Sequence, residues 1–236
     1  MQNELQNALR AAQNSADQVK KLAGAALEES KDLLHETVRE DDYIEIQNLM
    51  NRYASYHYYA EHGKTYEYFA LDDPRTTAEL GSTGVYKGRT KIYQMFQVYH
   101  DYNNQPGTAH LHPLNTPLVH VAADGETAKG YWFTNGLEVL PPPPGQPPLS
   151  MWFLDAYGMT FVKTKDGWRW LHFHMLDDLK AIFPVSWSVM NKEKFPGPSG
   201  LIPPSYTTGS YEPYWSGRKP SLDVDRLPEA YEHLDE

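Results

Sequence analysis

The chain of 236 residues contains no cysteine, which excludes disulfides, thiolate nucleophiles and thiolate metal ligands together. Basic residues are also scarce: 21 Lys and Arg stand against 31 Asp and Glu, leaving a formal charge of -10. Without a basic stripe, nucleic acid is not an expected partner. No apolar run approaches the roughly twenty residues of a membrane span, and the N-terminus lacks a basic and apolar signal. We therefore expect a cytoplasmic protein without a membrane partner.

Sequence motifs for cofactors and nucleophiles are missing as well. There is no glycine-rich phosphate loop, no dinucleotide fingerprint and no nucleophile elbow. Aromatic residues, in contrast, make up 13% of the chain and include 17 tyrosines. Several tyrosines gather between residues 53 and 68, which requires either a pocket or a large core.

The chain divides into three predicted segments. Residues 1–40 place small and apolar residues at alternating spacings of four and three, which predicts an amphipathic helix that packs on its own domain or on a neighbouring subunit. Residues 41–180 read as helices followed by antiparallel strands, an α+β domain. Residues 181–236 are rich in proline and aromatics, and we expect an irregular extension over its own or a neighbouring subunit. A homo-oligomer, dimer or trimer, is the expected assembly.

Strand-like alternation marks where chemistry is expected. A turn at residues 165–167 joins two strands, and counting by two places Trp168, Trp170, His172 and His174 on one face. Asp155 stands in a run that is otherwise nearly all apolar, which indicates an orienting carboxylate, an acid with a raised pKa or a water-facing edge residue. His35, His62, His100 and His233 fit surface positions.

Four motifs in order resemble the SnoaL-like branch of the nuclear transport factor two-like superfamily, to which scytalone dehydratase and bile-acid dehydratases belong. They are a helix within residues 46–69, GVYKGRTKIYQMF at 84–96, HLHPLNTPLVHVAADGETAKGYW at 110–132 and TFVKTKDGWRWLHFH at 160–174. The resemblance implies a cone: a strongly curved antiparallel sheet wrapped around helices, with an apolar pocket at one end.

The resemblance also implies site residues. Its dehydratases use a histidine near the start of the first long strand, and His110 and His112 occupy that position here. In this chain the position of their carboxylate on the first core helix falls within residues 56–59, which contain no carboxylate, and Glu61 is nearby. The expected catalytic residues are His110, His112, His57, Tyr58, Tyr59 and Asp155, and the expected substrate-binding residues are Tyr53, Trp132, Trp152, His172 and His174. Each also has a simpler interpretation as a core or hydrogen-bonding residue.

The predicted function is a cofactor-independent lyase acting on a small aromatic, phenolic substrate. Proton abstraction by a histidine would lead either to dehydration or to retro-aldol release of formaldehyde, as in resembling enzymes that act on lignin-derived diarylpropanes. A polyketide-cyclase or isomerase activity and a non-catalytic binding or assembly module are the alternatives. The His-x-His pairs at 110–112 and 172–174 are typical of strand-borne metal sites, but the resembling enzymes generally work without metal, so no metal or cofactor is expected.

Overall fold

The computed structural model describes residues 1–81, 83–142, 145–186, 188, 202–207 and 227–235, without the side chains of residues 32–37. The chain forms two compact units, Met1–Asp42 and Tyr43–Glu236. None of the described helices is long and apolar enough to cross a membrane. Much of the predicted C-terminal extension falls outside the described residues, so its path stays a prediction.

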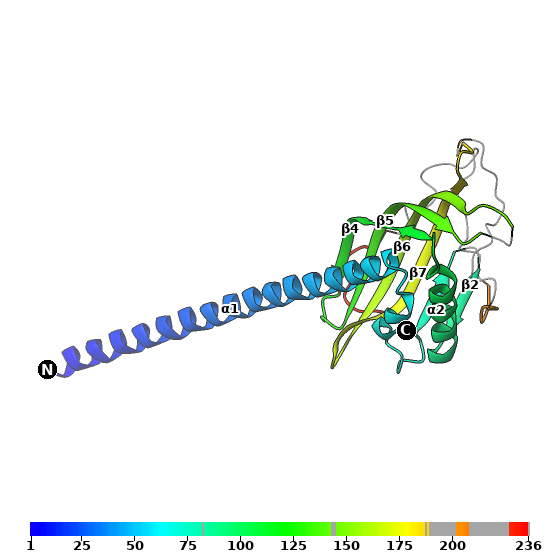
Figure 1. Ribbon diagram of the computed structural model, residues 1–236. Coiled ribbons are helices and arrows are strands. Elements are labelled where there is room, and N and C mark those ends of the chain that lie inside the picture. Colours follow the sequence, from blue (N-terminus) through cyan, green and yellow to red (C-terminus); the bar gives the residue numbers. More distant parts are fainter. Residues whose placement is uncertain (82, 143–144, 187, 189–201, 208–226, 236) are drawn as a thin grey trace. The chain divides into compact units, whose positions relative to one another are not determined.

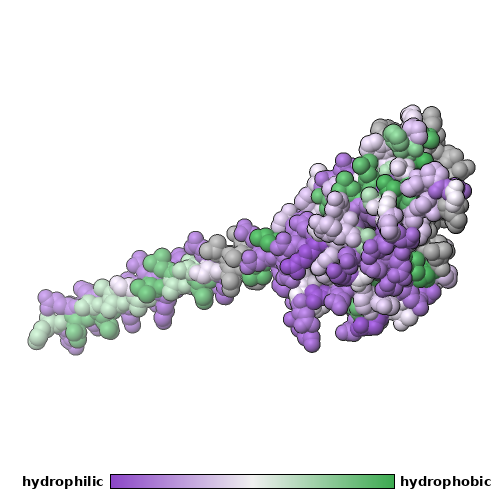
Figure 2. Space-filling model, viewed as in Figure 1, coloured by the Kyte–Doolittle hydropathy of each residue, from purple (hydrophilic) through white to green (hydrophobic). Residues whose placement is uncertain are grey.

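Helix α1 (Gln2–Tyr58) is continuous where the sequence patterns predicted two helices. Residues 38–43 contain neither glycine nor proline, so nothing there interrupts the helical hydrogen bonds. Within the first unit the predicted apolar stripe is exposed, with Leu5 at 74% and Leu9 at 62%. Figure 2 shows apolar atoms at the surface along this helix. In the second unit α1 carries buried side chains instead, such as Met50.

In the described part of the second unit, seven strands form one sheet in the order β2-β1-β7-β6-β5-β3, and β4 also pairs with β5 (Figure 1). Among these strands only β1 and β7 pair in parallel. The remaining elements are η1 (His62–Lys64), η2 (Tyr66–Tyr68), β1 (Thr77–Leu80), β2 (Gly84–Lys87), α2 (Arg89–Asn103), β3 (Ala109–Leu111), β4 (Leu114–Val121), β5 (Thr127–Leu140), β6 (Leu149–Thr164) and β7 (Gly167–Ile182). This curved, open sheet with helices confirms the predicted α+β class.

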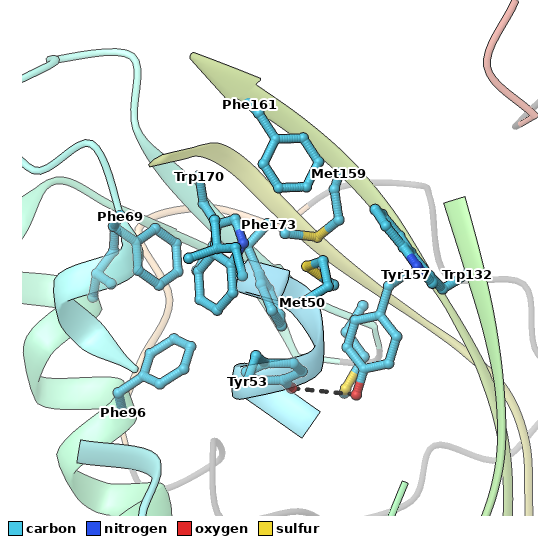
Figure 3. Close-up of a cluster of buried hydrophobic side chains, with 14 of the residues drawn as sticks. Met50, Tyr53, Phe69, Phe96, Trp132, Tyr157, Met159, Phe161, Trp170 and Phe173 are labelled. Atoms are coloured by element: carbon cyan, nitrogen blue, oxygen red, sulfur yellow. Dashed lines mark hydrogen bonds between the residues drawn. The ribbon is translucent and has the colours of Figure 1, made fainter. Parts of the chain in front are cut away.

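An aromatic core fills the space between the inner face of the sheet and the helices (Figure 3). The ring of Tyr53, from α1, meets Tyr157, Trp170 and Phe173 edge-on, with ring centroids 5.6, 5.3 and 5.4 Å away. Edge-to-face contacts of this kind stabilise beyond the gain from burial alone. Trp132, predicted to bind substrate, is 1% exposed and belongs to this packing.

A β-bulge in β7 reverses the predicted orientation of two histidines. Phe161 of β6 pairs with Trp170, but the preceding Thr160 pairs with His172, so Leu171 is an extra residue in β7. One extra residue shifts the two-residue period to the opposite face. The prediction that both histidines share a face with the two tryptophans was therefore wrong.

His172 and His174 instead lie on the outer face of the sheet. His172 Nδ1 is 2.9 Å from Thr77 Oγ1, and His174 Nε2 is 3.6 Å from Glu79 Oε1. His174 also lines an outer cavity of about 800 Å³, together with residues 227–229. The sheet therefore separates both histidines from the aromatic core.

Candidate active site

Two histidines meet at the point where α1 ends. His57 follows Tyr53 by four residues, so both project from one side of the helix, and their rings meet edge-on at 5.7 Å. After α1 ends at Tyr58, Ala60 adopts a positive φ of 55° and η1 turns the chain back. His62 is thereby buried, 4.4 Å from His57 between ring centroids. The surface position expected for His62 was wrong, because this turn leaves no helical or strand period in the sequence.

Two more histidines reach the same place from β3. His110 and His112 are 1% and 3% exposed, and both point to the inner face, as the period of two predicts. The ring centroid of His112 lies 4.4 Å from that of His57, and His112 stacks on Phe153 at 4.2 Å. His110 is 6.0 Å from His57 and 6.1 Å from His62. Four imidazoles thus form one buried cluster.

Strand β5 supplies the carboxylate that the helix lacks. Glu138 Oε1 is 3.2 Å from His112 Nε2 and 3.6 Å from His110 Nδ1. A Cβ at Gly136 would overlap the Leu111 carbonyl oxygen and crowd the His112 ring, so the close approach of β3 to β5 requires glycine there. Sequence reasoning missed Glu138, although it shares the inward phase of its strand with Gly136.

Burial and proximity set the charges of this cluster. Burial raises the pKa of Glu138, but the two imidazoles beside it outweigh that effect and hold its pKa well below the usual range. Burial, helped by His112 and His62, lowers the pKa of His57 far below its usual value. Burial and then His110 lower the pKa of His62 to about 3. At pH 7 the glutamate is therefore ionised, and His57 and His62 are neutral.

The cluster has unused hydrogen-bonding capacity. Among the described residues, Nδ1 of His57, both ring nitrogens of His62, Nε2 of His110 and Nδ1 of His112 are buried with neither a hydrogen-bond partner nor an ion-pair contact. Buried polar atoms are normally paired, with protein, water or ligand. The arrangement therefore suits a polar molecule that supplies the missing donors and acceptors.

A second polar group lies next to the cluster, on β6 and β7. Asp155 and Asp177 face each other across the two strands, and Lys180 Nζ is 2.6 Å from Asp177 Oδ1. A second bulge lets the backbone N–H of Asp178 donate to Asp155 Oδ1 at 3.2 Å. Asp155 Oδ2 is buried and has no hydrogen-bond partner among the described residues. The Lys180 ammonium sits 4.6 Å from the Phe153 ring centroid, the same ring on which His112 stacks.

This second group is rich in neutral proton donors. Burial, and next the negative charge of Asp177, raise the pKa of Asp155 well above its usual range, although Lys180 opposes them. Tyr53 Oη donates a hydrogen bond to Tyr157 Oη over 3.2 Å, as Figure 3 shows. Burial is the main cause that raises the pKa of both tyrosines. These shifts favour the protonated form of all three side chains.

The structure brings together only part of the predicted site. His57, His110, His112, Asp155 and Tyr53 lie around one buried polar region. Other predicted members do not: Tyr58 and Tyr59 are 51% and 68% exposed where α1 ends, and Trp152 is 39% exposed on the outer face. Trp152 there lines an apolar groove of about 550 Å³ with Leu111, Leu137, Leu154 and Leu179, among others. In the described part of the chain, no three His, Asp or Glu side chains are placed to hold one metal ion.

Comparison with known proteins identifies the family. The model of the SnoaL-like domain matches residues 39–174, more than half of the chain and all of the imidazole cluster. The chain belongs to the SnoaL-like family. A comparison of this SnoaL-like chain with curated proteins gave no match.

Solved structures share the fold of this SnoaL-like chain at low identity. A Novosphingobium aromaticivorans protein provisionally named a scytalone dehydratase is 10% identical, with a TM-score of 0.53, and the match covers 64% of this chain and 93% of that one. A type 2 hexachlorocyclohexane dehydrochlorinase (LinA) is 12% identical with the same TM-score, covering 64% and 95%. A third, provisionally named an aromatic ring hydroxylase from Novosphingobium aromaticivorans, is 19% identical with a TM-score of 0.50, covering 60% and 93%.

Proposed function

We propose that this SnoaL-like chain is a cofactor-independent lyase that acts on a small aromatic molecule by general acid/base catalysis. One observation carries the proposal: a buried site holds an ionised Glu138 beside His112 and, near it, an Asp155 that keeps its proton. Two carboxyl groups whose surroundings push their pKa values apart are the usual signature of a base and an acid. The names of two neighbours, a dehydratase and a dehydrochlorinase, are those of eliminating enzymes and support the same reaction class.

In the proposed reaction His112 is the base. The carboxylate of Glu138, 3.2 Å from His112 Nε2, stabilises the imidazolium that forms when His112 takes a proton. His110 touches the same carboxylate oxygen at 3.6 Å and is the second candidate for this role. The two predicted bases thus share one carboxylate, which lies on β5 and not on the first core helix as in the resembling dehydratases.

In the proposed reaction Asp155 is the general acid, and the hydroxyls of Tyr53 and Tyr157 are hydrogen-bond donors. In a dehydration the base removes a proton from carbon, the neighbouring C–O bond breaks, and Asp155 protonates the departing hydroxyl to give water. In a retro-aldol cleavage the base removes the hydroxyl proton, the C–C bond breaks to release formaldehyde, and the electron pair left on carbon takes the acid's proton. The hydroxyls of Tyr53 and Tyr157 would donate to a substrate oxygen on which negative charge develops. Phe153 and Tyr157 offer rings against which an aromatic substrate would pack.

A single probe distinguishes the two reactions. A phenolic aryl ketone with a hydroxyl on the third carbon yields an enone and water by dehydration, but a methyl ketone and formaldehyde by retro-aldol cleavage. We expect His112→Gln to lower turnover about 10²-fold, because the reaction loses its base. His172→Gln, an imidazole change on the outer face, should leave turnover unchanged. Product formation by NMR, with circular dichroism to confirm folding, measures both variants.

Other products would redirect the assignment. An isomer of the probe, formed without loss of water or formaldehyde, would favour an isomerase or cyclase. Stoichiometric binding of hydroxylated aromatic ketones without any turnover, equal in both variants, would favour a binding module and contradict the lyase proposal.

A further inference from the structure

Two carboxyl groups, those of Asp155 and Asp177, lie near the Lys180 ammonium, which forms an ion pair with Asp177. Its side chain is 15% exposed, and its ammonium contacts Asp177 at 2.6 Å, while Asp155 faces Asp177 across the strands. The Asp177 carboxyl group packs closely against the backbone at Gly81, where a Cβ would overlap it. Asp155 accepts one backbone hydrogen bond, from Asp178, and its other oxygen has no hydrogen-bond partner among the described residues.

The charge balance of this group decides which carboxyl is ionised. A buried cation must be neutralised by one anion, and a second anion beside the pair would be costly. The groups that act on Asp155 from the packed elements are Tyr53 on α1, Glu138 on β5, Tyr157 on β6 and Asp177, Asp178 and Lys180 on β7. With Lys180 already neutralised and Glu138 already negative, no uncompensated positive charge remains to ionise Asp155.

We propose that Asp177 is a positioning residue which, by pairing with Lys180, keeps Asp155 in the neutral form that can donate a proton. Asp177 need not touch substrate for this, because it acts through Lys180 and Asp155. The inference rests on the proposed lyase function in one respect, namely that Asp155 donates its proton during the reaction. The protonation state itself is a property of the free protein and can be measured without substrate.

Three variants separate the contributions. In Asp177→Asn the Lys180 ammonium loses its partner, and we expect it to ionise Asp155 and lower turnover about 10²-fold. In the double variant Asp177→Asn/Lys180→Met both charges are gone, so Asp155 should regain its proton and most of the turnover should return. Asp155→Asn assigns the signal. The primary measurement is the infrared or 13C NMR signal of a protonated aspartate in the free protein at pH 7.

The proposal expects this signal in the wild type and in the double variant, and its absence in Asp177→Asn and Asp155→Asn. It is overturned if the signal persists in folded Asp177→Asn, or if it is missing from the wild type or the double variant. Should Asp177→Asn fail to fold, Asp177→Ser, which also removes the charge beside Lys180, takes its place in the comparison with the double variant. If the signals behave as expected but no variant, nor the wild type, turns over the hydroxy ketone, the lyase proposal fails while the role of Asp177 stands.

Discussion

Replacing Glu138 with glutamine is expected to lower kcat about 10³-fold, a larger loss than His112→Gln alone, while the fold is retained. The amide keeps the shape of the side chain but removes the charge that lies 3.2 Å from His112 and 3.6 Å from His110. Either imidazole would then have to accept a proton without a counter-charge in a buried site, which is costly. Steady-state turnover of the phenolic hydroxy ketone measures the effect.

Glu126→Gln is the matched control, because Glu126 is an exposed residue next to the turn before β5. It should have wild-type turnover. A Glu138→Gln variant that retains more than a third of wild-type kcat would show that the carboxylate is only structural. In that case the base role of both strand histidines would lose its support.

Acid should destabilise the fold well before its carboxylates titrate, because two of its histidines resist protonation. Below pH 6.5 the unfolded chain protonates its histidines, whereas folded His57 and His62 stay neutral, the latter down to about pH 3. The unfolded state then binds more protons, so stability falls as pH falls. Asp155 opposes this trend, because the folded state keeps a proton that the unfolded chain releases above about pH 4. Glu138 adds its own loss only below about pH 4.5, where the unfolded carboxylate is protonated first.

Between about pH 4.5 and 6.5 His57 and His62 together outweigh Asp155 by one proton, or about 1.4 kcal/mol of unfolding free energy per pH unit, and the lowered pKa of His172 acts in the same direction. In His62→Leu the unfolded state binds one proton fewer in this pH range. The slope of the unfolding free energy against pH should therefore decrease by about 1.4 kcal/mol per pH unit. His233→Leu, which changes an exposed imidazole, should leave the slope unchanged. Urea unfolding at several pH values measures the slope. An unaltered slope in His62→Leu would mean that His62 is protonated in the fold.

Sequence patterns were sufficient where one regular period governs the side chains. The two-residue period of an extended chain places His110, in β3, and His112, just after it, on one inner face, where both are buried. The turn at residues 165–167 also forms as predicted, with Thr164 pairing Gly167. The same two-residue period could have predicted that Glu138 faces inward, because it lies two residues after Gly136 in β5.

The patterns failed where one residue breaks the period. The extra residue Leu171 turns His172 and His174 outward, and no residue type in the sequence marks that bulge. The turn through Ala60 buries His62 by tertiary packing, which local propensity does not encode. β7 also runs on to Ile182, well past His174, and this length brings Lys180 to the carboxyl groups.

The account claims that a buried histidine beside Glu138 is the base and that the buried Asp155 is the acid. The pH dependence of kcat/KM for the phenolic hydroxy ketone, measured in the wild type and in Asp155→Asn, tests this claim most directly. In the wild type activity should fall at high pH, because Asp155 loses the proton that it donates. Asp155→Asn should be slower and should lack the high-pH limb. A variant whose activity falls at high pH as that of the wild type does would contradict the account, because the acid would then be another group.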